Sequence, residues 1–139
     1  MGDLDAAPVL DSDVLIDHLR DAGPGRELVD VLAATTGYLV TSVSAFELAL
    51  GRDYAHNPGP ADRLLAAPFL TFTREAGIRA GALLRELRAH GLGIEVRDAM
   101  QAGICLDVGA PLVTRNARRF ERVPELRVVE PGQWLSAST

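Results

Sequence analysis

Short apolar segments alternate with longer amphipathic ones along the chain, and this alternation restricts the fold more than any other feature. Apolar segments of strand length occupy residues 9–10, 38–40, 69–72, 111–114 and 127–129. Helical periodicity covers residues 14–20, 26–34, 44–51, 74–90 and 95–108, a short helical turn is predicted at 117–121, and a loop with Pro and Gly at 52–62. Strands separated by helices indicate βαβ units, so we expect an α/β fold with a mostly parallel central sheet.

The length of 139 residues predicts a single domain, residues 1–139. No apolar segment approaches the roughly 20 residues of a membrane span, so we expect no membrane association. Cys105 is the only cysteine, which makes an internal disulfide impossible. The N-terminal segment MGDLDAAP is acidic and lacks the basic start of a signal peptide. We therefore expect a cytoplasmic protein.

All 14 basic residues are arginine, in a chain whose formal net charge is −5. The absence of lysine excludes two kinds of protein that carry acidic residues at a strand end. The DSD triplet at 11–13 suggests a phosphatase with an aspartate nucleophile, but that chemistry uses a lysine to hold the phosphate. A phosphorylatable receiver domain also needs a lysine, so neither activity fits this chain.

Four polar residues follow strands or begin helices at one edge of the predicted sheet. A crossover helix begins on the side where its strand ends, so strand C-termini and helix N-termini share one edge, where α/β proteins bind ligands. Asp11 directly follows the first strand, and Asn116 lies just past the strand at 111–114. Glu47 and Asp98 lie near the starts of two helices. We expect these side chains to converge, although they are far apart in the sequence.

Each acidic residue also has a purely structural explanation. Glu47 matches the last position of an S-x-x-E capping box at a helix start. Asp13 suits a helix N-cap, and Asp17 is expected to face solvent on the same helix. Asp98 could be a solvated acid in a first helical turn, where it complements the helix dipole, and Asn116 could be a turn residue.

The expected convergence of three carboxylates favours a bound cation over these separate explanations. Two carboxylates about 4 Å apart repel by about 4 kcal/mol at an effective dielectric near 20. A divalent cation is the natural compensation, and oxygen ligands without His or Cys favour Mg²⁺ or Mn²⁺ over zinc. The three histidines share no metal-ligand spacing and are expected at the surface.

Four segments, spread over about residues 8–131, are informative together: VLDSDVLIDHL, TSVSAFELALG, IEVRDAMQAGICLDVGAPLVTRN and RRFERVPELRVVEP. In their order and spacing they resemble the PIN-domain family, and most closely its VapC-type toxins from prokaryotic toxin–antitoxin pairs. The resemblance implies a three-layer α/β/α fold and a metal-dependent ribonuclease. It implies that Asp11 and Asp98 bind the metal and that Glu47 matches the family's helical glutamate. We assign Glu47 to hold the metal through water or to orient the attacking water. Asn116 falls at the family's fourth polar position, and the secondary candidates are Asp13 and Thr114.

The sequence departs from the family at Arg119, where many relatives have an acid before the Phe of the last motif. The acidic set is thereby reduced to three firm carboxylates, and Arg119 is placed to reach into the site. Nearby, the 3–4 spacing of Arg115, Arg118 and Arg122 predicts one basic face that follows RNA phosphates. A solvated charged turn is the alternative interpretation of the same residues.

The resemblance further implies a cognate antitoxin protein as partner, an RNA substrate and homodimerisation. The main hypothesis is therefore a Mg²⁺- or Mn²⁺-dependent ribonuclease toxin. The alternative is a catalytically weak PIN domain that acts as a regulatory RNA- or protein-binding module. The neutral Asn116 and the basic Arg119 are the features that favour the alternative.

Overall fold

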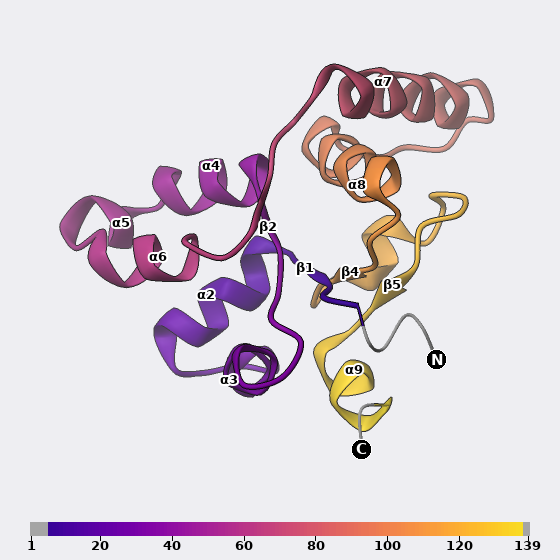
Figure 1. Cartoon of the computed structure of the whole chain (residues 1–139). Helices are drawn as coiled ribbons and strands as arrows, with labels where there is room; N and C mark the ends of the chain where they lie inside the picture. The colour runs from indigo at the N-terminus through magenta and orange to yellow at the C-terminus, as the bar shows by residue number, and fades with distance from the viewer. Residues whose placement is uncertain (1–5, 138–139) are drawn as a thin grey trace.

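The structure is a computed structural model that describes residues 6–137. Residues 1–5 of the acidic N-terminal segment lie outside the described residues. Two sets of parallel strands occupy the centre of the described chain (Figure 1). In the first, β4 (Leu112–Val113) lies between β1 (Val9–Leu10) and β5 (Val128–Val129); in the second, β2 (Val40–Thr41) pairs with β3 (Phe69–Leu70).

A parallel bridge between Val9 and Leu39 joins the two sets of strands. The Leu10 N–H donates to the Leu39 carbonyl at 3.0 Å, and the Leu39 N–H donates to the Pro8 carbonyl at 2.8 Å. In register, Val9 lies opposite Leu112, and Leu112 lies opposite Val128. The neighbouring strands therefore follow the order β3, β2, β1, β4, β5, all parallel, which confirms the predicted sheet.

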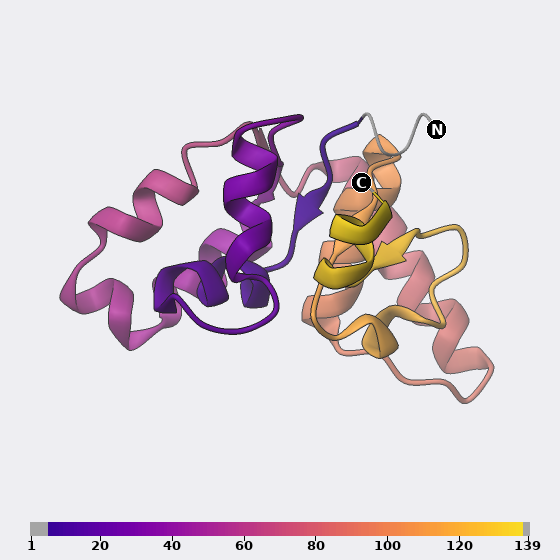
Figure 2. The ribbon, with the colours of Figure 1, turned by 90° about the horizontal axis from the view of Figure 1, so that it is seen from below.

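The helices connect the strands and cover both faces of the sheet. After β1 come α2 (Ser12–Arg20) and α3 (Arg26–Ala33), and after β2 come α4 (Ser42–Leu50), α5 (Arg52–His56) and α6 (Gly59–Leu64). After β3 come α7 (Arg74–Ala89) and α8 (Val96–Val108), which lead into β4. The 3₁₀ helix η1 (Ala117–Phe120) connects β4 to β5, and α9 (Pro131–Ala137) follows β5. Figures 1 and 2 show α2 and α3 on one side of β1, and α7 and α8 on the other.

Alternating strand residues enter two different cores. Leu10 and Val113 belong to a cluster with residues of α2, α3, α4, α6 and α9, such as Leu28 and Trp134. Val9 and Leu112 belong to a cluster with residues of α7, α8 and η1. Because successive side chains of a strand point to opposite faces, this division is what a sheet covered on both sides requires. The three-layer α/β/α architecture expected from the sequence is confirmed.

The segment 52–62 was expected to be a loop, and that expectation is wrong because the segment forms α5 and the start of α6. Proline is compatible with a first helical turn, where its missing N–H would have no intrahelical acceptor, and Pro60 lies there in α6. The Tyr54 hydroxyl donates to Asp62 Oδ1 at 2.8 Å, which ties the two short helices together. The helix α9, which begins at Pro131, was not predicted.

The C-terminal ends of β1, β2 and β4 lie at one edge of the sheet. Asp11 follows β1 directly, Thr41 ends β2, and Thr114 follows β4. The helix α8 begins at Val96 and packs against α4 and η1. This edge therefore brings together the segments that carry the candidate residues. Within residues 6–137, no helix is long and apolar enough to cross a membrane.

Candidate functional site

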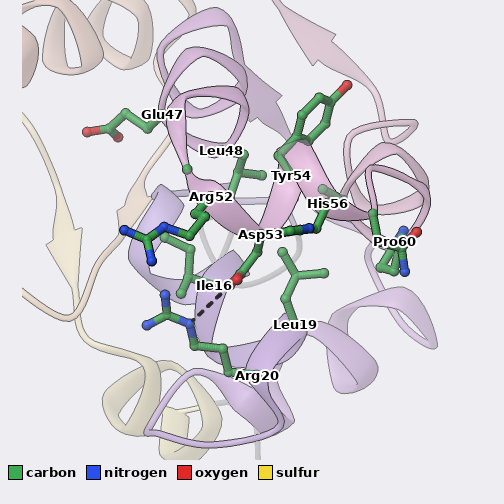
Figure 3. A pocket seen from close by; sticks show the side chains of 13 residues that line it. Ile16, Leu19, Arg20, Glu47, Leu48, Arg52, Asp53, Tyr54, His56 and Pro60 are labelled. Carbon is green, nitrogen blue, oxygen red and sulfur yellow. Dashed lines mark ion pairs between the residues drawn. The ribbon is translucent and has the colours of Figure 1, made fainter.

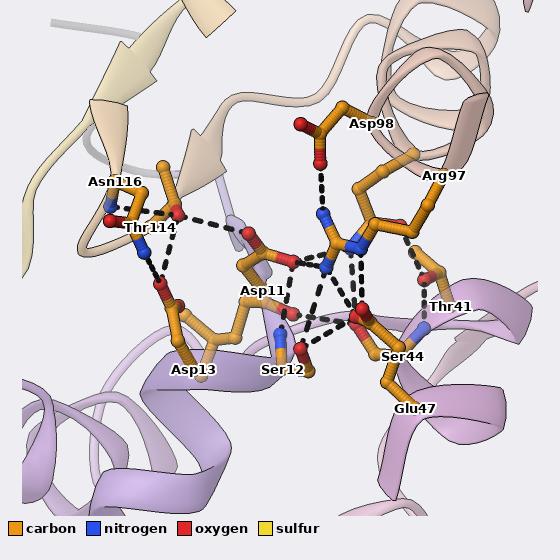
Figure 4. A network of polar contacts seen from close by, with 12 residues as sticks. Asp11, Ser12, Asp13, Thr41, Ser44, Glu47, Arg97, Asp98, Thr114 and Asn116 are labelled. Atoms are coloured by element: carbon orange, nitrogen blue, oxygen red, sulfur yellow. Dashed lines mark hydrogen bonds and ion pairs between the residues drawn. The ribbon is translucent and has the colours of Figure 1, made fainter. Parts of the chain in front are cut away.

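Three carboxylates from three separate segments of the chain meet at this edge, around the guanidinium group of Arg97 (Figure 4). Asp11 comes from the end of β1, Glu47 from the middle of α4, and Asp98 from the first turn of α8. The Asp11 and Asp98 side chains are 1% and 2% exposed, whereas Glu47 is 26% exposed. The structure thus brings together the three carboxylates that the topology predicted to converge.

Asp11 caps α2, because its side chain accepts a hydrogen bond from the Ser12 N–H at 3.0 Å. The sequence predicted Asp13 as the N-cap, and that prediction is wrong by two residues because the helix begins at Ser12. Gln101 Nε2 also donates to Asp11 Oδ1 at 3.1 Å, and the Thr114 hydroxyl donates to Oδ2 at 2.9 Å. These bonds fix both oxygens of a buried carboxylate.

Glu47 takes no part in a capping box. The N-cap of α4 is Thr41, whose hydroxyl oxygen accepts from the Ser44 N–H at 3.1 Å. Glu47 lies nearly two helical turns beyond this cap, and its Oε1 accepts from the Ser12 hydroxyl at 2.6 Å. The capping explanation of Glu47 is therefore wrong, because α4 begins two residues earlier than the periodicity predicted. Its carboxylate is free to face the cluster.

Asp98 is held by two arginines. Arg119 Nε donates to Asp98 Oδ2 at 3.0 Å, and Arg119 Nη2 donates to Oδ1. Arg97 Nη1 also donates to Oδ1 at 2.7 Å. The hydrogen bond to Asp98 raises the pKa of Arg119 above its ordinary value. The expectation that Arg119 reaches into the site is confirmed, and the interpretation of Asp98 as a solvated surface acid is wrong.

Arg97 lies at the centre of the cluster, and sequence reasoning did not assign it there. Its Nε donates to Glu47 Oε2 at 2.6 Å, and its Nη2 donates to Asp11 Oδ1 and Glu47 Oε1. Burial acts to lower the pKa of Arg97, but the hydrogen bond with Glu47 and the charge of Asp11 outweigh it. Its pKa therefore lies above the ordinary value of an arginine, and the group remains charged.

Asp13, Thr114 and Asn116 form a second branch beside Asp11 (Figure 4). Asn116 Nδ2 donates to Asp13 Oδ2 at 2.9 Å, and the Thr114 hydroxyl lies 3.2 Å from the same oxygen. Burial, and then the charge of Asp11, raise the pKa of Asp13 against these hydrogen bonds. Among the carboxylates of the site, Asn116 thus bonds to Asp13 and not to Asp11, Glu47 or Asp98. Within residues 6–137, Asp13 Oδ1 is the one buried side-chain oxygen or nitrogen without a hydrogen-bond partner.

A layer of buried polar side chains forms hydrogen bonds with the buried side of the cluster. Gln101 Nε2 bonds to the Ser44 hydroxyl at 3.0 Å as well as to Asp11, and its Oε1 accepts from the Thr41 hydroxyl at 2.6 Å. Gln101 and Thr41 are completely buried. Sequence reasoning missed these residues. The available signal was the spacing of Gln101 from Asp98, because residues three apart lie on the same face of a helix.

The predicted basic face is divided in the structure. Arg118 and Arg122 line a cleft of about 570 Å³ that also contains Asp98, Arg119 and the segment 93–95. Arg115 is not among the residues lining this cleft, and its Nη1 instead donates to Asp17 Oδ1 at 2.8 Å. The cleft therefore connects two of the three candidate arginines with the acidic cluster.

A second hollow lies between α2, α4, α5 and α6 (Figure 3). Its volume is about 360 Å³, and its lining is mainly apolar and includes Ile16, Leu19 and Leu48. Arg20 and Asp53 also line it, and their side chains pair at 3.6 Å. Glu47 belongs to its rim, and Figure 3 shows that the Glu47 carboxylate points away from the hollow. Phosphate or metal chemistry therefore fits the acidic cluster and not this hollow.

The donor chemistry of the cluster fits a hard divalent cation, because three carboxylates already converge on one positive group. The unpartnered Oδ1 of Asp13 adds an available oxygen beside Asp11. With the guanidinium of Arg97 between them, however, no three Asp, Glu, His or Cys side chains in residues 6–137 are placed to hold one metal ion in common. The three carboxylates are suitable ligands for a metal ion, but in this structure they bond to Arg97 instead.

Comparison with protein families and curated proteins gives one family and a named relative. The family model described as the PIN domain matches residues 9–126. The sequence is 29% identical over 102 residues to the tRNA(fMet)-specific endonuclease VapC of Salmonella typhimurium. That alignment covers 68% of this chain and 75% of the relative.

Comparison with solved structures gives the same architecture. The chain is similar to VapBC2 from Rickettsia felis bound to a DNA fragment from its promoter, with a TM-score of 0.76 and 22% identity over 89% of this chain and 98% of that one. It is also similar to a toxin–antitoxin complex from Klebsiella pneumoniae, with a TM-score of 0.71 and 20% identity over 90% and 98% of the two chains. At these identities the similarity establishes the fold.

Proposed function

The chain belongs to the PIN-domain family, and we propose on that premise that it is a metal-dependent ribonuclease that acts as the toxin of a toxin–antitoxin pair. The observation that carries the proposal is the convergence of Asp11, Glu47 and Asp98 on one cationic group at the edge where the strands end. The named relative supports the reaction class, because it is an endonuclease that acts on an RNA.

The three carboxylates have different tasks in the proposed hydrolysis. Asp11 and Asp98 are nearly completely buried and would hold the metal, Mg²⁺ or Mn²⁺. When bound, such an ion supplies a water of lowered pKa and neutralises charge that develops at the phosphorus. Glu47 is the most exposed of the three, so its carboxylate would be the one to accept a hydrogen bond from the attacking water and orient it.

The neighbouring polar residues orient the acids and the substrate. Gln101 and Thr114 hold the Asp11 carboxylate in one orientation through its two oxygens. Asn116 is exposed at the rim, where its amide is available to a phosphate oxygen. Asp13 connects Asn116 to Thr114 and provides a further oxygen near Asp11.

The RNA would approach through the cleft that contains Asp98. Arg118 and Arg122 are exposed on its wall, so their guanidinium groups are available to phosphate oxygens. Arg115 is committed to Asp17 and is a weaker candidate for this role. Two arginines beside an acidic centre would attract the RNA backbone in an otherwise acidic protein.

The proposal includes a cognate antitoxin as partner. The similar structures from Rickettsia felis and Klebsiella pneumoniae were solved as complexes, and the latter is described as a toxin–antitoxin complex. Homodimerisation in the cytoplasm, as the family resemblance implied, belongs to the same proposal. It is supported by exposed apolar side chains on α4, where Phe46 and Leu50 are 63% and 75% exposed.

One observation favours the alternative of a catalytically weak binding module. Arg97 and Arg119 already neutralise two of the three negative charges of the cluster. If these arginines never leave, the site would bind RNA or protein without cutting. The alternative predicts RNA binding without cleavage in Mg²⁺, whereas the main proposal predicts cleavage that stops when the metal is chelated.

The deciding experiment expresses the full chain in a host without its antitoxin, and compares it with Asp98→Asn and Asp107→Asn. Asp107 is a matched control, because it lies on the same helix but pairs with Arg79 away from the cluster. We expect growth arrest with the native chain and Asp107→Asn, and normal growth with Asp98→Asn. Purified protein should cut RNA in Mg²⁺ and not in EDTA. Arrest or cleavage that persists in Asp98→Asn would overturn the proposal.

A further inference from the structure

Within residues 6–137, Arg97 is the one residue that bonds to all three central carboxylates. Its Nε reaches Glu47 Oε2 at 2.6 Å, its Nη1 reaches Asp98 Oδ1 at 2.7 Å, and its Nη2 bonds to Asp11 and Glu47. Figure 4 shows the guanidinium surrounded by the three acidic side chains. Its side chain is 18% exposed, so the charge lies largely out of water.

The carboxylate oxygens of the cluster are already occupied by protein donors. Arg97 bonds to one oxygen of Asp11, both oxygens of Glu47 and one of Asp98. Arg119 takes the remaining oxygen of Asp98, and Thr114 takes that of Asp11. To bind a metal ion, a carboxylate oxygen must direct a lone pair at the ion. Arg97 and a divalent cation therefore compete for the same oxygens and for the space between them.

The cluster needs a cation whether or not a metal is present. Two of its three carboxylates are nearly completely buried, and without a positive charge between them their mutual repulsion in a partly desolvated site would force them apart. Arg97 is permanently charged, and its planar fork matches several carboxylate oxygens at once. Arg119 cannot replace it in this role, because its bonds in the cluster reach Asp98 alone among the three.

We propose that Arg97 is an internal counter-ion that holds the acidic cluster together in the metal-free protein and must leave before a divalent cation can bind Asp11, Glu47 and Asp98. The inference rests on the proposed function, because it takes this cluster to be the metal site. Arg97 then sets the affinity of the cluster for a metal ion, and the site opens only when this one side chain at the start of α8 is displaced.

Arg97 is placed so that it can leave without unfolding the core. It lies in the first turn of α8, between the exposed Val96 and the buried Asp98, and its own side chain keeps some contact with solvent. The bonds that must break are between side chains and do not include the backbone bonds of α8. The supporting bonds of Asp11 to Gln101, Thr114 and the Ser12 N–H remain when Arg97 leaves.

The test measures Mn²⁺ binding by electron paramagnetic resonance on the full-length native chain, Arg97→Gln and Arg119→Gln. Arg97→Gln removes the planar guanidinium that bonds to all three carboxylates. Arg119→Gln is matched to it because it removes the same charge but, among the three carboxylates, loses contacts to Asp98 alone. We expect Arg97→Gln to bind Mn²⁺ about tenfold or more tightly than the native chain, and Arg119→Gln to show a smaller gain. Arg97→Lys, which keeps the charge without the fork, should give an intermediate affinity and keeps the test valid if the glutamine variant does not fold.

Thermal unfolding in EDTA supplies a second measurement that does not depend on activity. Arg97→Gln should melt below the native chain in EDTA, and Mn²⁺ should raise its melting temperature by more than it raises that of the native chain. Equal Mn²⁺ affinities of Arg97→Gln and the native chain, weaker binding by Arg97→Gln, or an equal gain in Arg119→Gln would overturn the role of Arg97 and leave the ribonuclease proposal standing. Absence of Mn²⁺ binding in every variant would overturn both.

Discussion

Asp17 and Arg115 form an ion pair that joins α2 to the turn after β4, with Asp17 Oδ1 2.8 Å from Arg115 Nη1. Asp17 was expected to face solvent, and that expectation is wrong because its side chain is 6% exposed. Its second oxygen accepts from the Gly25 N–H at 2.8 Å. Gly23, with φ of +96°, packs so closely on this carboxylate that a Cβ there would lie 2.5 Å from Asp17 Cγ. Asp17 therefore organises the α2–α3 turn from inside.

Arg115→Ala should destabilise the protein, because it leaves a buried carboxylate with one donor fewer. Hydrogen bonds to charged groups contribute about 1.5–3 kcal/mol, and we expect a loss of that size in the free energy of unfolding by urea. Arg118→Ala is the matched control, since Arg118 is exposed, and it should change stability by less than about 0.5 kcal/mol. Equal stability of the two variants would show that the Asp17 pair contributes nothing measurable.

The packing of α7 on α8 depends on a glycine. A Cβ added to Gly103 would lie 2.6 Å from the Ala76 carbonyl oxygen and 3.0 Å from the Ala80 Cβ. Gly103→Ala should push the two helices apart and lower the free energy of unfolding by about 1–3 kcal/mol. Gly81→Ala in α7 meets no atom within 4 Å and should raise it by about 0.5–1 kcal/mol. Calorimetric melting of both variants tests whether stability falls in Gly103→Ala and rises in Gly81→Ala.

Asp13 should make the stability of the metal-free protein depend on pH. Burial and the charge of Asp11 raise the pKa of Asp13 in the folded chain. An acid whose folded pKa is raised stabilises the fold in its protonated form, so the native chain loses this contribution as the pH rises through the folded pKa. Asp13→Asn, measured in EDTA, should therefore be more stable than the native chain at neutral pH. The difference should shrink toward pH 3.8, the ordinary pKa of the group.

Asp107→Asn removes one carboxylate at a half-buried position outside the cluster and serves as the control for this pH series. It separates the effect of removing a carboxylate in general from the effect of removing Asp13. If the Asp13→Asn curve runs parallel to the native one from acid to neutral pH, the raised pKa of Asp13 is contradicted.

The convergence of the three acids could be predicted because it depends on topology alone. Parallel strands and crossover helices must deliver Asp11 and Asp98 to one edge, whatever the details of packing. The exact helix starts could not be predicted in this way. The hydroxyls of Thr41 and Ser44 both suit a helix cap, and the packing of β2 against β3 decides that Thr41 takes the role.

The orientation of the Arg97 side chain could not be predicted from the sequence, for a different reason. An arginine beside an aspartate in a first helical turn is equally typical of a solvated surface. Gln101 lies four residues after Arg97 and three after Asp98, so all three share a face, but its burial at 0% exposure depends on contacts with Thr41 and Ser44 from another helix start. The pairing of Asp17 with Arg115 likewise joins residues 98 positions apart and is set by the tertiary fold.

The division of the basic residues gives a prediction for RNA binding. Arg118 and Arg122 line the cleft with Asp98, whereas Arg79 lies near Pro111, at the other end of β4. In an Asp98→Asn background, which our proposal expects to be unable to cleave RNA, Arg118→Ala and Arg122→Ala should weaken the binding of a single-stranded RNA. Each should also reduce the slope of log affinity against log salt by about 0.7, the value for one phosphate contact on a single strand.

Fluorescence anisotropy over a salt series measures both quantities, with Arg79→Ala as the matched control at the far end of the sheet. Arg79→Ala removes the same charge from the protein as a whole, so it separates a local phosphate contact from a change in net charge. Arg115→Ala should weaken binding less than Arg118→Ala, because its guanidinium is held by Asp17. A salt slope that falls equally in Arg79→Ala and Arg118→Ala would mean that RNA does not follow this cleft.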